Sequence, residues 1–261
     1  MSFKLDGGFG DHLKVYAAFA LRFLSSPSIK NSSPRFNWTF TDNIIPNDTL
    51  AQRNDTRSSL RKILRSLEAC DSVNSDMITL SLDNHSYYMP YQCLYANRKL
   101  ILDRLIDVDT IPRKLEVSKN DIVISFRLGM GENEVVPYAF SDQGNQLPFD
   151  YYIKSLDMIT RMNDISRTIF ICSDNYQHDK IKMLKSKYPN AVSLEGFNTL
   201  EQFRIILDSS YFISSNSSFS IMASIFMNDD STICYPSSGK HLELHDIPIN
   251  EPRIIRVPEY E

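Results

Sequence analysis

The sequence predicts an α/β protein of two lobes, each built on a parallel sheet, with a ligand cleft between them. Three observations predict this class. The C-terminal half alternates short apolar runs with helical patterns, which is typical of a parallel sheet covered by helices. The 261-residue length accommodates two modest lobes, and Ile111-Pro112-Arg113-Lys114 has the composition of a linker. Polar turns also follow the predicted strands at their carboxyl ends, where open parallel sheets bind ligands.

The first lobe is predicted to span residues 1–112 and to begin with a strand, a glycine turn and a helix. The apolar run Phe3-Lys4-Leu5 precedes the turn Asp6-Gly7-Gly8-Phe9-Gly10-Asp11-His12, and apolar residues at helical spacing follow it. That helix is expected to end at Ser25-Ser26-Pro27. Three further elements are expected after a polar loop: an amphipathic helix over residues 58–69, a strand over residues 77–82 and a helix over residues 93–106.

The second lobe, residues 113–261, carries the regular part of the pattern. Buried strands are expected over residues 122–126, 168–172, 211–214 and 232–235. Helices are expected over residues 148–162, 176–187, 199–208 and 217–227. We expect Pro148 to open the first of these helices, and Thr199 with Gln202 to form a capping box on the third.

Composition excludes several classes of function. The formal charge of −4 and the lack of a long Lys/Arg cluster argue against a nucleic-acid partner, so any phosphate-bearing ligand is expected to be small. No apolar run is long enough for a transmembrane segment. Asp107-Val108-Asp109 has the spacing of a metal-binding Asp-x-Asp pair but follows a helix, so we expect no metal there. Four scattered cysteines indicate neither a zinc cluster nor a disulfide framework, and we expect a cytoplasmic protein.

Four turns carry the candidate chemistry, each directly after a predicted strand. They are the glycine turn that contains Gly8, the position of Arg127, the position of Asp174 and the segment Ser215–Ser218. Glycines let the backbone approach a ligand closely, and the first amides of a helix attract a negative group. A guanidinium also suits the oxygens of a phosphate. The sequence therefore predicts an anion site at one edge of the sheet.

Each of these positions has a structural alternative that the sequence leaves open. Arg127 either binds an anion or pairs with Asp121, Asp174 or Glu132. Asp174 either accepts hydrogen bonds from a base or ribose or caps the helix after it. The serines of 215–218 either hold a phosphate or cap the helix that they precede.

These segments resemble motifs of the fucosyltransferase superfamily that includes α-1,2-, α-1,6- and protein-O-fucosyltransferases. Gly7-Gly8-Phe9-Gly10-Asp11-His12 resembles the N-terminal G-G-x-G-N-Q motif of the α-1,2 family, and Ser125-Phe126-Arg127-Leu128-Gly129 resembles its H-x-R-R-G-D or H-L-R-x-G segment. Phe170-Ile171-Cys172-Ser173-Asp174-Asn175 resembles a strand that ends in S/T-D-D. The segment from Asp208 to Ser220 is similar to the signature that ends I-x-S-N-S-S-F-S, and this match is the most specific.

The resemblance spans most of the chain and implies a GT-B arrangement of two Rossmann-like lobes. It implies an inverting transfer with no metal or other cofactor, GDP-fucose as a donor held mainly by the C-terminal lobe, and a glycan or saccharide acceptor on the N-terminal side. The donor-binding residues that it implies are Gly8, Phe9, Gly10, His12, Ser125, Arg127, Asp174, Asn216, Ser217, Ser218 and Phe219.

Catalysis would then require a cation at the leaving diphosphate and a base at the acceptor. Arg127 is the candidate cation, and Glu134, Glu132 and Asp11 are the candidate bases. The chain departs from the family pattern where it has Ser125 for His, Leu128 for the second Arg, Met130 for Asp and Asp11-His12 for Asn-Gln. Three alternatives stay open: another donor such as a UDP-sugar, a non-catalytic glycan- or nucleotide-binding protein, and an unrelated α/β protein with accidental matches.

Overall fold

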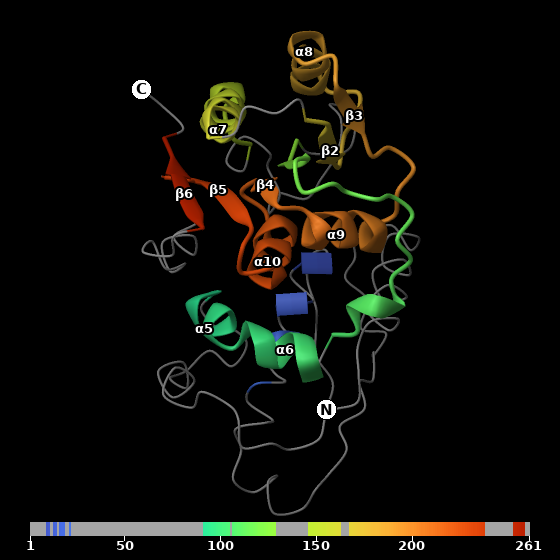
Figure 1. The fold of residues 1–261 in the computed structure, drawn as a ribbon, viewed down its shortest axis with the longest axis vertical. Coiled ribbons are helices and arrows are strands. Elements are labelled where there is room, and N and C mark those ends of the chain that lie inside the picture. The colour runs from blue at the N-terminus through green and yellow to red at the C-terminus, as the bar shows by residue number, and fades with distance from the viewer. Residues whose placement is uncertain are drawn as a thin grey trace, which may run out of the picture. The chain divides into compact units, whose positions relative to one another are not determined.

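Six parallel strands form one sheet in the C-terminal part of the chain (Figure 1). The computed structural model describes residues 9–10, 13–14, 16–18, 21, 91–104, 106–128, 146–162, 167–237 and 253–258. The strands lie in the order β3-β2-β1-β4-β5-β6. Their bounds are β1 Ile122–Phe126, β2 Ile169–Ser173, β3 Ala191–Ser193, β4 Tyr211–Ile213, β5 Thr232–Pro236 and β6 Ile254–Val257. This all-parallel order confirms the α/β class and is that of a Rossmann-like sheet.

Helices cover both faces of the sheet. They are α7 Phe149–Arg161, α8 Asp179–Lys187, α9 Thr199–Asp208 and α10 Ser218–Phe226. Figure 1 shows α7 and α8 on one face and α9 and α10 on the other. The connection through α7 carries the chain from β1 to β2, and the connection through α10 carries it from β4 to β5 in the opposite direction. The order of the strands therefore reverses between β1 and β4, which is where open α/β sheets bind ligands.

Alternation along β1 fixes which side chains face this point. Ile122, Ile124 and Phe126 belong to one buried core cluster with residues of α7 and α8. Successive side chains of a strand point to opposite faces, so Ser125 faces the other helical layer. Its hydroxyl accepts a hydrogen bond from Ser220 of α10 at 2.7 Å, as this geometry requires.

The four predicted strands are confirmed to within one residue at each end, but β3 and β6 were not predicted. Both lie at an edge of the sheet and are short, and Val192 of β3 is 47 % exposed. A short strand with exposed side chains lacks the long apolar run by which the central strands are recognised.

Two helix starts differ from the sequence prediction. Pro148 is the N-cap of α7 rather than its first helical residue. The helix α8 begins at Asp179, later than residue 176, because the Nδ1 atom of His178 accepts the Lys180 N–H at 3.1 Å and caps it.

The capping box of α9 lies one residue earlier than predicted, at Asn198 and Glu201 instead of Thr199 and Gln202. Glu201 also accepts a hydrogen bond from Lys114, with Nζ and Oε1 2.5 Å apart. Burial opposes ionisation of Glu201, but the hydrogen bonds from Lys114 and from the Asn198 backbone outweigh it, so its pKa lies below the ordinary value. Asn198 and Glu201 have the spacing of a capping box, and Lys114 gives Glu201 a further partner from outside the helix.

The chain divides into two compact units, Met1–Pro112 with Glu243–Ile247, and Arg113–Leu242 with Pro248–Glu261. In the first unit Phe9 and Gly10 are already helical and buried, so the predicted turn does not extend through them. Glycine tolerates helical dihedrals and does not by itself mark a turn. The expected helix over residues 93–106 is divided into α5 Tyr91–Ala96 and α6 Arg98–Arg104 by Asn97, whose side chain bonds the Cys93 carbonyl.

The predicted elements over residues 3–5, 58–69 and 77–82 lie outside the described residues. Within the part of the chain that the structure describes, no helix is long and apolar enough to cross a membrane.

Candidate functional site

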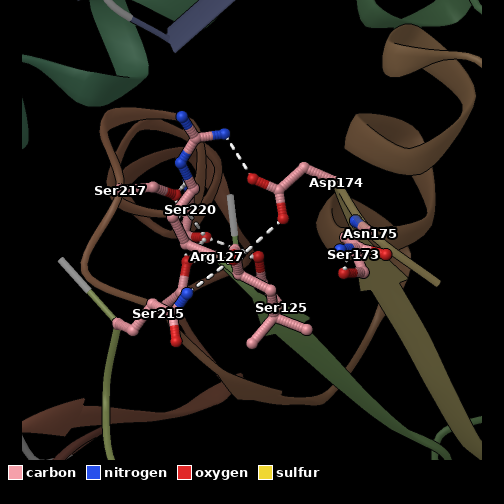
Figure 2. Close-up of polar contacts among 10 residues, drawn as sticks. Ser125, Arg127, Ser173, Asp174, Asn175, Ser215, Ser217 and Ser220 are labelled. Atoms are coloured by element: carbon pink, nitrogen blue, oxygen red, sulfur yellow. Dashed lines mark hydrogen bonds and ion pairs between the residues drawn. The ribbon is translucent and has the colours of Figure 1, made fainter. Parts of the chain in front are cut away.

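The carboxyl ends of β1 and β4 bring two polar segments together. Arg127 follows β1 directly, and Ser214 to Ser217 connect β4 to α10. Because β1 pairs with β4 in parallel, both segments leave the sheet at the same edge. Figure 2 shows Arg127 between Asp174 and the serines of this turn. The site therefore lies where the strand order of the sheet reverses.

Four serine hydroxyls form a connected cluster at the β4 side of the site (Figure 2). Ser217 donates to Ser220 at 3.0 Å, and Ser220 donates to Ser125 at 2.7 Å. Ser215 lies 3.4 Å from Ser125 and 3.0 Å from Ser217, measured between Oγ atoms. When Ser125 donates to Ser215 and Ser215 donates to Ser217, every hydroxyl donates once and accepts once. We call these four residues the serine ring.

The serine ring can donate one hydrogen bond to a ligand. Ser125, Ser215 and Ser220 are buried, whereas Ser217 is half-buried. The Oγ atoms of Ser215 and Ser220 are also 2.7 Å apart. Ser215 can therefore turn its proton to Ser220 when Ser217 donates to a ligand, so no buried oxygen loses its donor.

Ser217 is also the N-cap of α10, since its Oγ atom accepts the Ser220 N–H at 3.3 Å. The capping alternative for the serine segment is thus confirmed at this residue. Capping uses an acceptor position of the hydroxyl and leaves its proton available. The Ser218 amide, at the first position of the helix, has no acceptor within the helix.

Arg127 forms an ion pair with Asp174, with Nη1 and Oδ2 2.5 Å apart. Among the three carboxylates that the sequence left open, the structure thus selects Asp174. Asp121 instead accepts the backbone N–H groups of Ser118 and Thr168, and Glu132 lies outside the described residues. Within the described residues Asp174 is the hydrogen-bonding partner of the Arg127 guanidinium. The Arg127 side chain is 37 % exposed.

Asp174 uses its second carboxylate oxygen on the backbone. Oδ1 accepts the Leu128 N–H at 2.8 Å, while Oδ2 accepts from Arg127. Asp174 does not cap the following helix, because His178 does so. The capping alternative for Asp174 is therefore wrong.

Two tyrosines of α7 lie beneath the site, and the sequence reasoning did not identify them as part of it. The Tyr151 hydroxyl donates to the carbonyls of Ser214 and Cys234 at 2.8 and 3.0 Å, which links the end of β4 to the middle of β5. The Tyr152 ring stacks on Phe126 with centroids 4.0 Å apart. The only signal in the sequence is a pair of adjacent tyrosines after Pro148, which a helical pattern assigns to the core.

Burial raises the pKa of Tyr152 far above its ordinary value, and the nearby Asp174 charge raises it further. Its hydroxyl is buried without a hydrogen-bond partner in the described part of the chain. Tyr152 therefore stays protonated and adds no charge near the ion pair.

The remaining predicted donor-binding residues of this unit lie in or beside the β4–α10 turn. Asn216 is 4 % exposed, and its Oδ1 atom has no hydrogen-bond partner in the described ranges. Ser218 and Phe219 form the first turn of α10, and the Phe219 ring packs against Phe203 with centroids 6.2 Å apart.

Seven predicted site residues lie in the first unit or outside the described residues. Phe9 and Gly10 belong to the helical residues of the first unit. Gly8, Asp11, His12, Glu132 and Glu134 lie outside the described residues. The site described above is therefore the part formed by the second unit, and the predicted general bases remain predictions.

The chain fits no model of a known protein family, and no curated protein is significantly similar to it in sequence. The resemblance to fucosyltransferases therefore rests on the motifs alone.

Proposed function

We propose that the protein is an inverting, metal-independent glycosyltransferase that transfers L-fucose from GDP-fucose to a hydroxyl of a glycan or saccharide acceptor. One observation carries the proposal: a guanidinium and a serine-rich helix start meet where the strand order of a Rossmann-like sheet reverses. Both groups favour a phosphate, the first by its charge and fork of N–H groups and the second by its unpaired amides.

In this proposal the donor diphosphate lies between Arg127 and the start of α10. Nη1 of Arg127 is held by Asp174, and the edge formed by Nε and Nη2 faces two phosphate oxygens. The Ser217 hydroxyl and the Ser218 amide donate to further oxygens of the same group. These contacts strengthen as the bond between sugar and phosphate breaks, because negative charge then develops on the departing diphosphate.

The transfer is a single displacement. A base takes the proton of the acceptor hydroxyl, the acceptor oxygen bonds to the anomeric carbon, and the nucleoside diphosphate leaves from the opposite side with the bonding electrons. The configuration of that carbon is thereby inverted. Glu134, Glu132 and Asp11 stay the candidate bases, and the GT-B arrangement, with residues 1–112 on the acceptor side, is part of the same proposal.

A second donor fits the same site. The departures at Ser125 and Leu128 alter the surroundings of the nucleotide, and Leu128 presents only its backbone N–H to Asp174. A UDP-sugar is therefore the alternative donor. A third candidate, a binding protein without turnover, stays open because Leu128 and Met130 stand where the resembling motif has polar residues.

Ligand-induced stabilisation tests the proposal first. GDP at a hundredfold excess over its dissociation constant stabilises the folded state by about 2.7 kcal/mol, or roughly 5–10 °C in melting temperature. Stabilisation by UDP and not by GDP would show that the donor is a UDP-sugar rather than GDP-fucose. Absence of stabilisation by any nucleotide or nucleotide sugar would end it.

Donor consumption with a panel of saccharide acceptors then separates an enzyme from a binding protein. We expect release of GDP that depends on the acceptor. Binding of GDP-fucose with neither transfer nor hydrolysis would favour the binding protein.

A further inference from the structure

We infer that Asp174 is a positioning residue, which fixes the Arg127 guanidinium and the end of β1 for a phosphate without touching that phosphate itself. The inference rests on the proposed function, and it changes the role that the sequence predicted for Asp174. The sequence left Asp174 either as a ligand of a base or ribose of the donor or as the cap of the following helix.

The contacts of Asp174 carry the inference. Its two oxygens bind two consecutive residues, Arg127 through the guanidinium and Leu128 through the backbone N–H. One carboxylate thus sets both the direction of the side chain and the path of the backbone that bears it. A guanidinium has five N–H groups in a rigid fork, so the bond at Nη1 orients the others and leaves the edge of Nε and Nη2 for a ligand.

Asp174 is itself held in place. The parallel register pairs Phe126 with Ser173, which puts Asp174 level with Arg127 one residue beyond the strands. The Ser173 N–H donates to the Tyr176 hydroxyl at 3.2 Å, and the Ser173 hydroxyl accepts the Asn175 N–H at 3.0 Å. The carboxylate is therefore attached to a fixed turn rather than to a free loop.

A competing role for Asp174 predicts the opposite change in anion affinity on its removal. If Asp174 only occupied Arg127 in competition with a phosphate, its removal would free the guanidinium and remove a repelling negative charge. Anion affinity would then rise. A positioning residue predicts the reverse, because an unheld arginine must be ordered by the ligand itself.

The experiment measures the affinity for inorganic pyrophosphate by calorimetry in wild-type protein, D174N and D179N. Asp179 is an exposed carboxylate that pairs with Lys182 on the surface of α8, so D179N is the matched control for the same chemical change. We expect D174N to bind about ten- to a hundredfold more weakly, as for loss of a hydrogen bond to a charged group, and D179N to be unchanged. Equal or tighter binding by D174N overturns the inference.

A double-mutant cycle separates positioning from general damage to the fold. In an R127M background D174N should weaken pyrophosphate binding no further, since Asp174 acts through the guanidinium that is already gone. An additive loss overturns the inference.

A measurement without ligand distinguishes failure of this inference from failure of the proposed function. If wild-type protein binds no pyrophosphate, the proposed phosphate site is wrong. The positioning of Arg127 is still judged by NMR. Hydrogen exchange at the Arg127 Nη1–H groups and the Leu128 amide, which both donate to Asp174, should be faster in D174N than in D179N, and equal exchange overturns the inference.

Discussion

Replacing Arg127 with Met separates catalysis from stability. The substitution keeps an unbranched side chain and removes every guanidinium N–H that the proposal directs at the diphosphate. Removal of one preorganised donor of this kind commonly costs about 3 kcal/mol, so kcat should fall by two to three orders of magnitude. The effect should appear in kcat as well as in kcat/KM, because the contact strengthens as charge develops.

The structure limits the accompanying loss of stability. The Arg127 side chain is 37 % exposed, and the Asp174 side chain is 21 % exposed. Solvent screens such a pair, which contributes at most about 1 kcal/mol to folding. Asp174 also keeps the Leu128 N–H as a donor. The melting temperature of R127M should therefore fall by only roughly 2–4 °C.

Steady-state release of GDP from GDP-fucose, with an acceptor identified in the panel above, measures the first effect, and thermal unfolding measures the second. R161M is the matched control, because Arg161 is exposed in the last turn of α7. An R127M variant with the kcat of the wild type would refute the reasoning. Loss of activity together with a collapse in melting temperature would show that the ion pair is structural instead.

Three further predictions concern the surroundings of the site. Ser217→Ala removes the cap of α10, so urea unfolding should show a free energy of unfolding lower by about 1 kcal/mol. The variant should also bind pyrophosphate more weakly, and unchanged binding would exclude Ser217 from the site. Tyr151→Phe removes the hydroxyl shared by two carbonyls and should cost about 1 kcal/mol in the same assay, whereas a neutral result would deny that bond a role. The lowered pKa of Glu201 stabilises the fold above about pH 4.5, and this contribution disappears as the pH falls through the folded-state pKa. Unfolding between pH 3 and 7 should therefore depend less on pH in Glu201→Gln, and parallel curves would contradict this.

The central strands could be predicted because they are buried on both faces and read as unbroken apolar runs. All five residues of β1 are buried, and the apolar run that predicted the strand has the same bounds. The edge strands could not be predicted, because exposure at one face removes the unbroken apolar run. β3 has three residues, and its middle residue is exposed. The starts of α7 and α8 were displaced by local caps, since Pro148 and His178 each precede the first helical residue.

The location of the site could be predicted from a rule of topology, since the carboxyl ends of parallel strands meet at one edge. The ion-pair partner of Arg127 could not be predicted from this rule. Asp121 and Asp174 both flank strands, but Asp121 precedes β1 and lies at its other end, whereas the register of β1 with β2 puts Asp174 level with Arg127. Register is a property of the assembled sheet and is absent from either strand alone.

Ser125, which replaces the histidine of the resembling motif, suits the serine-rich turn after β4. Ser125 lies where the resembling fucosyltransferase motif has a histidine, and its Oγ atom is 2.7 Å from Ser220 and 3.4 Å from Ser215. An imidazole is much larger than a hydroxymethyl group and would overfill this buried space. The ring also needs at position 125 a group that accepts one hydrogen bond and donates another, which a hydroxyl supplies at any pH between 5 and 8 and an imidazole does not. Ser125 therefore completes the uncharged serine ring. Among the described side chains of the site, the only fixed positive charge is the Arg127 guanidinium, which Asp174 holds.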